Sequence, residues 1–221
     1  MKKFLSALCV TALSLLVYGQ DGHPSSISGN RRNFSFAWLT DVHLNSFAYA
    51  EDDLRQAVED INANPDVDFT ILSGDVTEFG DTKEFQLLEE ILKGFRKPYL
   101  LLPGNHDVNW SENGCTMFDK IFRASHFCYD WQGVRFVGCG AGPSLRMGPP
   151  HIPREEILWL DSVYNATPAA QPVIFVNHFP LNADLSNCRE VLRILKTRIR
   201  RPYSPDTCTS TAHTMPTAFR E

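Results

Sequence analysis

Side chains that can bind metal ions follow four apolar runs of this sequence, FSFAWLT, VDFTILSG, PYLLLPG and VIFVN. They are Asp41 and His43 after the first run, Asp75 after the second, Asn105, His106 and Asp107 after the third, and His178 after the fourth. All of them are oxygen or nitrogen donors, and no thiolate is among them. Such donors suit Mn, Fe, Zn or Mg rather than copper or an iron–sulfur cluster.

The number of these donors exceeds what one tetrahedral zinc ion takes. Two carboxylates, two or three imidazoles and an amide instead fit a pair of divalent ions bridged by a carboxylate. Taken singly, an Asp after a strand often belongs to a turn, and a lone His is usually a core or surface residue. Four runs that all end in such side chains favour one joint site. Gly74, Gly80 and Gly104 beside them let the backbone approach closely.

Alternating strand and helix patterns must position these residues. Leu54, Val58 and Ile61, for example, recur at helical spacing. We expect helices over 52–64, 82–95, 116–122, 153–164 and 187–197, strands within 34–41, 67–75, 98–107 and 172–180, and a hairpin over 127–140 that turns near Gln132 and Gly133. The alternation predicts an α/β domain. In such sheets, ligands bind at the carboxyl ends of the strands, where the metal-type side chains stand.

The ordered motifs DVH, GDVTEFG, GNHD and NHFP carry a resemblance to a known family. With this order and spacing, the sequence resembles the calcineurin-like metallophosphoesterase family from about Phe34 to Lys196. The resemblance implies a four-layer α/β/β/α sandwich of two packed sheets flanked by helices, with C-terminal strands missing from this chain. It also implies a phosphate-ester substrate, which is a phosphomonoester, a phosphodiester or a pyrophosphate link.

The resemblance also implies roles for the metal-type residues. Asp41 and His43 would hold the first of two divalent ions. Asn105 and His178 would hold the second, and Asp75 would bridge both. Because such ions lower the pKa of bound water toward about 7, a hydroxide that they activate would attack phosphorus.

Two more residues of the GNHD motif receive catalytic roles from the resemblance. His106 would lie beside the phosphate and assist its leaving group, while Asp107 would orient the His106 ring and raise its basicity. Purple acid phosphatases carry a metal-binding Tyr three positions after the bridging Asp, and Glu78 stands there in this chain. This difference argues against that subclass. Glu78 is either a partner of the metal ligands or a turn carboxylate, and the sequence leaves both open.

The remaining histidines match no family motif. His23, His126, His151 and His213 are therefore expected at the surface, although the loop that carries His151 could reach over the site.

The N-terminus predicts export. Two lysines precede an apolar run from Phe4 to Val17 that is too short to span a bilayer, and a cleavage site is expected near Gly19. We expect a cleaved signal peptide over residues 1–19, a polar linker over 20–32, and a secreted or periplasmic protein without a transmembrane segment after cleavage. A short N-terminal membrane anchor is the alternative. The net charge of -5 gives no nucleic-acid-binding footprint.

Six cysteines occur in the chain, and Cys9 would leave with the signal peptide. The five that remain imply at least one free thiol outside the cytosol. Disulfide connectivity cannot be read from the sequence, and a bond between Cys115 and Cys128 is one example. Oligomeric state is equally open.

The end of the chain, residues 199–221, does not continue the domain over 33–198. Its Ser, Thr and Pro content is typical of a disordered tail. The resemblance, however, implies a further strand with a Gly-His-x-His metal motif after the last helix. Read one base out of register, the codons of residues 202–216 permit VFSGHLHVNRAHNA. A one-base frameshift between about Thr197 and Pro202 is therefore the favoured explanation.

Two other functions stay open at this point. The 221-residue product could be a catalytically impaired fragment, because each metal would lose one His ligand. It could also be a secreted binding protein on the same scaffold, although the intact His106–Asp107 pair speaks against this.

Overall fold

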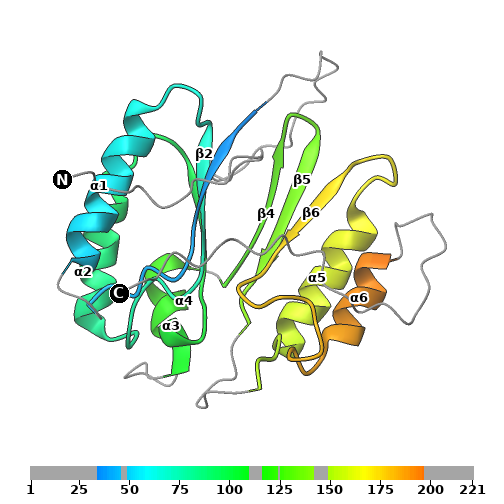
Figure 1. Ribbon diagram of the computed structural model, residues 1–221. Helices are drawn as coiled ribbons and strands as arrows, with labels where there is room; N and C mark the ends of the chain where they lie inside the picture. The colour runs from blue at the N-terminus through cyan, green and yellow to red at the C-terminus, as the bar shows by residue number, and fades with distance from the viewer. Residues whose placement is uncertain (1–33, 46–48, 110–115, 124, 142–148, 197–221) are drawn as a thin grey trace.

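A computed structural model describes residues 34–45, 49–109, 116–123, 125–141 and 149–196 of the chain. The predicted signal peptide, linker and tail lie outside these residues, so their boundaries and the frameshift stay predictions. The predicted helices and strands of the domain are confirmed, with ends that differ by a few residues (Figure 1). One short helix, α3 (His106–Asn109), was not predicted.

The first sheet is parallel and has the order β1-β2-β3, formed by Phe36–Leu39, Phe69–Ser73 and Tyr99–Leu102. Every residue of the central strand β2 is buried. A strand that is covered on both faces reads as a continuous apolar run, which explains the sequence FTILS. Because the three strands run the same way, their carboxyl ends meet at one edge.

The second sheet has the order β4-β5-β6, formed by His126–Trp131, Val134–Cys139 and Val173–Val176. Strands β4 and β5 form the predicted hairpin, and β6 pairs in parallel with β5. The hairpin turns at Gln132 and Gly133, which both have positive φ (48° and 81°). Two such residues match the type I′ turn of a two-residue hairpin.

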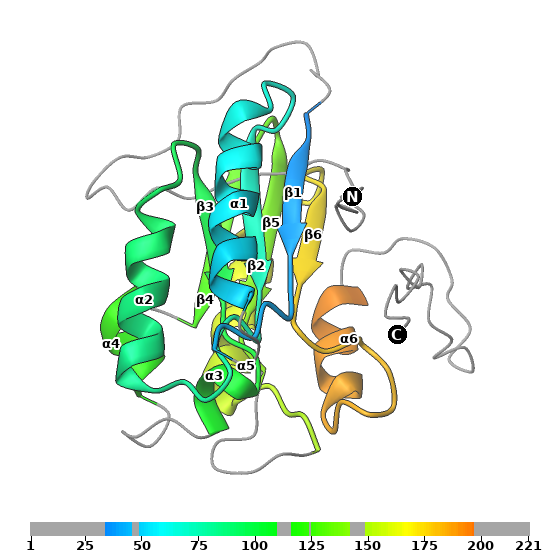
Figure 2. The same cartoon turned by 60° about the vertical axis from the view of Figure 1, so that its left-hand side comes forward.

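Helices cover the outer face of each sheet (Figures 1 and 2). Helices α1 (Ala50–Ala63), α2 (Thr82–Leu92) and α4 (Met117–Phe122) lie on the side of the first sheet, whereas α5 (Arg154–Ala166) and α6 (Cys188–Lys196) cover the second. Helix α2 begins with a capping box, in which the Asp81 side chain accepts from the Glu84 amide and the Glu84 side chain accepts from the Asp81 amide.

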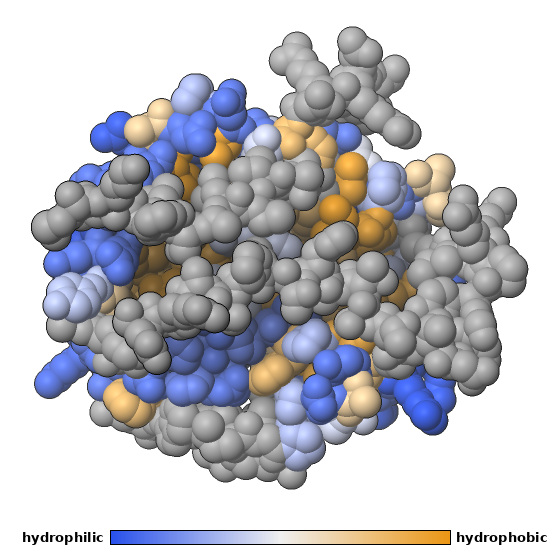
Figure 3. Space-filling model, viewed as in Figure 1, coloured by the Kyte–Doolittle hydropathy of each residue, from blue (hydrophilic) through white to orange (hydrophobic). Residues whose placement is uncertain are grey.

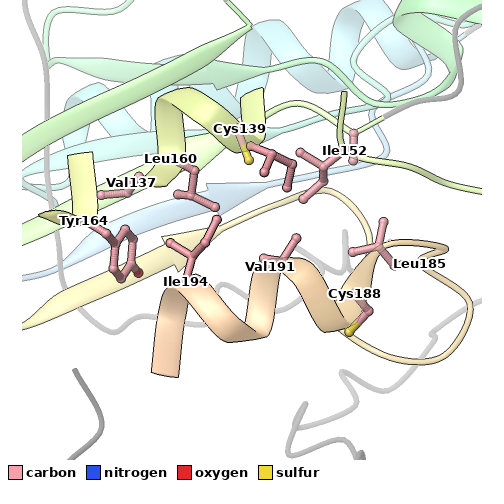
Figure 4. Close-up of a cluster of buried hydrophobic side chains, with 11 residues drawn as sticks. Val137, Cys139, Ile152, Leu160, Tyr164, Leu185, Cys188, Val191 and Ile194 are labelled. Atoms are coloured by element: carbon pink, nitrogen blue, oxygen red, sulfur yellow. The ribbon is translucent and has the colours of Figure 1, made fainter. Parts of the chain in front are cut away.

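The core has three main layers of buried apolar side chains. Between the sheets, residues such as Phe69 and Leu102 of the first pack against Phe136 and Val176 of the second. A second cluster joins the first sheet to α1, α2 and α4. The third joins the second sheet to α5 and α6 and contains Val137, Leu160 and Val191 among others (Figure 4). The described residues thus form the predicted α/β/β/α sandwich.

The surface shows the same layering. In the view of Figure 1, hydrophilic side chains gather on the left, over the outer helices, while apolar side chains are visible in the middle, over the strands (Figure 3). Among the described helices, none is long and apolar enough to cross a bilayer. Cys128 and Cys139 are free thiols. Cys115, which the sequence analysis named as an example of a partner for Cys128, lies outside the described residues.

Candidate metal centre

Backbone hydrogen bonds continue beyond the ends of β1 and β2 and hold the first two motif loops together. The Asp41 amide donates to the Gly74 carbonyl (3.1 Å), and the His43 amide donates to the Asp75 carbonyl (2.9 Å). An isolated parallel bridge between Leu44 and Thr77 extends this contact. The DVH and GDVTEFG motifs therefore lie side by side because their backbones are paired.

Three of the predicted ligands have a strained backbone. Asp41, His43 and Asp75 have φ values of 54°, 48° and 49°, in the left-handed region. Of the described residues other than glycine, six have positive φ, so half of them are predicted ligands. Such a conformation costs about 1–3 kcal/mol and clusters at functional sites, where the surrounding structure enforces it.

Two groups of side chains in the described residues bring their ligand atoms within 4.8 Å of one another. One group contains His43, Asp75 and His106, and the other contains Asp41, Asp75 and His178. Asp75 belongs to both. Nε2 of His43 lies 3.8 Å from Asp75 Oδ2 and 3.9 Å from Asp41 Oδ1. Carboxylate oxygens and imidazole nitrogens converging on a shared carboxylate fit a pair of divalent ions.

Asp75 is the buried centre of the site, with 4% of its surface exposed. Burial opposes ionisation of its carboxyl group. The hydrogen bond and charge of His178, together with the His106 amide, outweigh that effect and lower the pKa of Asp75. The His106 amide donates to Asp75 Oδ1 at 2.9 Å. Asp75 is thus held as a carboxylate in a place where an unpaired charge would be costly.

His178 reaches the site from the second sheet. Its Nε2 lies 3.3 Å from Asp75 Oδ2, and its Nδ1 lies 3.0 Å from the Ser73 carbonyl. Burial lowers the pKa of His178, but its hydrogen bond to Asp75 and the neighbouring charges raise it by more, so the net shift is upward. His178 therefore joins the two sheets at the predicted centre.

His106 stands beside His43, with ring centroids 4.5 Å apart in an edge-on arrangement. Its Nδ1 lies 2.8 Å from the carbonyl oxygen of Glu78, which requires a proton on Nδ1. Asn105 precedes it in the same loop and is half-buried; its carbonyl accepts from the Val108 amide. The loop has no room at Gly104, because a Cβ there would overlap the carboxylate and amide of Asp75.

Asp107 has a different set of contacts from the one that the resemblance implied. The buried carboxylate accepts from the Gly104 amide (2.7 Å), the Val76 amide (3.3 Å), and both the amide and the hydroxyl of Thr77 (2.8 and 2.7 Å). Burial raises the pKa of Asp107 despite these hydrogen bonds. Its contacts tie the GNHD loop to the GDVTEFG loop, and it is Glu78 that provides the acceptor at His106 Nδ1.

The sequence analysis did not predict that Glu78 and Thr77 form hydrogen bonds with residues of the site. Glu78 Oε2 lies 2.8 Å from Nδ1 of His43. Its position three residues after Asp75 was a signal, but a turn carboxylate would have the same spacing. Thr77 gave no signal, because a buried hydroxyl partner cannot be told from an ordinary strand-end Thr.

Two histidines outside the motifs are placed away from these groups. His126 lies 3.0 Å from Glu156 Oε1 and stacks on Trp159, and His151 lies 3.0 Å from the Ser186 hydroxyl. Neither belongs to the two ligand groups of the described residues.

Comparison with known proteins identifies the family of this chain. The family model of calcineurin-like phosphoesterases matches residues 34–214. The chain belongs to the calcineurin-like phosphoesterase family. Among curated relatives, this chain is 26% identical over 172 residues to a probable glycerophosphodiester phosphodiesterase of Arcobacter nitrofigilis, with 67% of this chain and 58% of the relative covered. It is 28% identical over 157 residues to a probable cyclic nucleotide phosphodiesterase of Rhodopseudomonas palustris, with 66% and 57% covered.

The chain therefore spans a little over half the length of these curated relatives. Among solved structures, a dimetal phosphatase from Danio rerio matches with a TM-score of 0.55 and 15% identity, over 74% of this chain and 77% of that one. At this identity the similarity supports the fold, which is the metallophosphoesterase sandwich.

Proposed function

We propose that the protein is a metal-dependent phosphoesterase that hydrolyses phosphodiesters. The observation that carries the proposal is the position of Asp75, a buried carboxylate shared by two groups of metal-type side chains. Family membership gives the reaction class. The curated relatives are named phosphodiesterases, which favours a diester over a phosphomonoester.

Asp41 and His43 would hold one ion and His178 and Asn105 the other, with Asp75 between them, as the family resemblance implies. By proximity alone, the described residues group Asp41 with His178 and His43 with His106, and Asp75 belongs to both groups. When bound, two divalent ions supply Lewis acidity toward a phosphoryl oxygen and make water a better nucleophile near neutral pH. The buried negative charge of Asp75 and the partly exposed charge of Asp41 would be neutralised by them.

His106 is the group that would assist the substrate. Its Nδ1 proton is held by the Glu78 carbonyl, and this fixes the ring edge that carries Nε2. A protonated Nε2 would donate to a phosphoryl oxygen or protonate the leaving oxygen. Such an acid contributes about 10²–10⁴-fold to the rate.

The test is turnover of bis(p-nitrophenyl) phosphate and p-nitrophenyl phosphate by the purified chain with added Mn²⁺. We expect faster turnover of the diester, and none after chelation of the metal. His106→Ala should lower the rate about 10²–10⁴-fold while the protein still binds Mn²⁺.

A matched control is His151→Ala, because His151 bonds Ser186 rather than the ligand groups. It should keep wild-type turnover. Absence of metal-dependent turnover on both esters would refute the proposed function, and unchanged turnover of His106→Ala would remove this residue from the reaction. The binding-protein alternative predicts the first of these results.

We also propose that the protein is exported. The support is the N-terminal pattern of two lysines followed by a short apolar run from Phe4 to Val17, with a cleavage site expected near Gly19. Fractionation of the expressing cells, with mass analysis of the mature N-terminus, tests it; an intact Met1 on cytoplasmic protein would contradict it.

A further inference from the structure

We infer that the carboxylate of Glu78 is a positioning group that fixes the ring of His43. The inference rests on the proposed function, because it assigns Glu78 a task in the same metal centre. The main-chain carbonyl of the same residue contacts His106 and stays in place when the side chain is replaced.

The contacts are direct. Glu78 Oε2 lies 2.8 Å from His43 Nδ1, and the Glu78 carbonyl lies 2.8 Å from His106 Nδ1. Its second carboxylate oxygen, Oε1, lies 3.8 Å from His106 Nδ1. Only 18% of the Glu78 side chain and 23% of the His43 side chain are exposed, so water competes weakly for these bonds.

Glu78 is itself fixed on both sides. Its amide donates to the Leu44 carbonyl (3.1 Å), in the segment that carries His43. The next amide, that of Phe79, donates to Glu84 Oε2 (2.9 Å), and Glu84 is fully buried in the first turn of α2. The Glu78 carboxylate therefore starts from a rigid backbone next to its target, which lowers the entropy lost in holding the ring.

This geometry decides which His43 nitrogen can face a metal. A hydrogen bond to a carboxylate places a proton on Nδ1, and Nε2 is then the nitrogen that lies 3.8 Å from Asp75 and 3.9 Å from Asp41. A carboxylate on the far nitrogen fixes the tautomer and makes the facing nitrogen a stronger ligand. A turn carboxylate would instead accept from nearby backbone amides, as Asp81 does at the start of α2.

The experiment compares Glu78→Ala, Glu78→Gln and Glu78→Asp with the exposed control Glu59→Ala in the full chain. Mn²⁺ affinity is measured by counting free Mn²⁺ by electron paramagnetic resonance. The proton on the His43 ring is read in the metal-free protein from ¹⁵N chemical shifts, assigned with His43→Gln. Thermal unfolding of each variant reports on the fold.

Glu78→Ala should weaken Mn²⁺ binding about 10–100-fold and release the His43 ring into a mixture of tautomers. Glu78→Gln keeps an acceptor oxygen, so it should keep the Nδ1 proton and lose less affinity. The side chain of Glu78→Asp is one methylene shorter and does not reach His43 as well. Its Mn²⁺ affinity and its His43 tautomers should therefore be closer to those of Glu78→Ala. Glu59→Ala should match wild type in both measurements.

An unchanged His43 tautomer in both Glu78→Ala and Glu78→Asp would overturn the inference, as would wild-type Mn²⁺ affinity in both. If Glu78→Ala does not fold, the Gln and Asp variants decide. Neither measurement uses a substrate. A protein that binds Mn²⁺ but has no turnover would therefore contradict the proposed function without contradicting the role of Glu78. A wild-type protein that binds no Mn²⁺ would overturn the role of Glu78 in positioning a metal ligand.

Discussion

Asp107 stabilises the loops of the site through hydrogen bonds to Gly104, Val76 and Thr77, none of which is a predicted metal ligand. It is fully buried, and four hydrogen bonds from Gly104, Val76 and Thr77 satisfy both of its oxygens. A buried charge is tolerated only when it is bonded in this way. These bonds fix the loops that carry Asp75 and His106, so Asp107 acts on the site through the backbone.

Asp107→Asn should therefore destabilise the protein. An amide offers one acceptor oxygen, and its NH₂ group would face a backbone amide that also donates, which leaves buried donors without partners. We expect a loss of about 3 kcal/mol in the free energy of unfolding, measured by urea denaturation. The control is Asp66→Asn, an exposed residue, which should change the free energy by less than about 0.5 kcal/mol. Equal stability of the two variants would contradict the role of Asp107 as a clamp.

At the scale of single elements, sequence patterns predicted most of the fold. Helix α1 was expected over 52–64 and runs from Ala50 to Ala63, because its apolar stripe and acidic first turn are both local signals. Helix α3 was not predicted, since four residues within a motif show no periodicity. The parallel pairing of β6 with β5 could not be read either, because partner choice depends on how α5 returns the chain across the sheet.

The β4–β5 hairpin offers a prediction at this scale. Gln132 has a φ of 48°, which costs an L-residue with a long side chain about 1 kcal/mol. Asn tolerates this region better and is favoured before Gly in type I′ turns. Gln132→Asn should therefore raise the free energy of unfolding by about 0.5–1 kcal/mol, as measured by urea denaturation.

The matched control is the same substitution in a helix, Gln56→Asn. Asn is a poorer helix former than Gln, so this variant should lose about 0.5 kcal/mol. If Gln132→Asn lost as much stability as Gln56→Asn, the backbone conformation of the turn would not be a source of strain that Asn relieves.

At the scale of the whole molecule, the predicted metal centre is built across two sheets. The first sheet supplies the loops of Asp41, Asp75 and Asn105, while His178 follows β6 of the second. The sequence could predict these residue types and their order, because strand ends and motifs are local features. It could not predict that His178 also bonds the Ser73 carbonyl or that Asp107 joins two loops, since both depend on tertiary packing.

The packing between the sheets should therefore matter to metal binding as well as to stability. Phe136 is fully buried between the sheets, 6.3 Å from the ring of Phe69 in an edge-on contact. Phe136→Ala should cost about 3–5 kcal/mol in the free energy of unfolding. It should also weaken Mn²⁺ binding, because the contact between His178 and Asp75 relies on the docked sheets.

Thermal unfolding with excess Mn²⁺ and with chelator separates these two effects. Metal that binds only the folded state raises the melting temperature, and the rise should be large in wild type, smaller in Phe136→Ala and smallest in His178→Ala. The control Leu158→Ala removes an exposed apolar side chain of α5 and should keep the full rise. A rise in His178→Ala equal to that of wild type would mean that the second sheet does not contribute a ligand, and the centre would then belong to the first sheet alone.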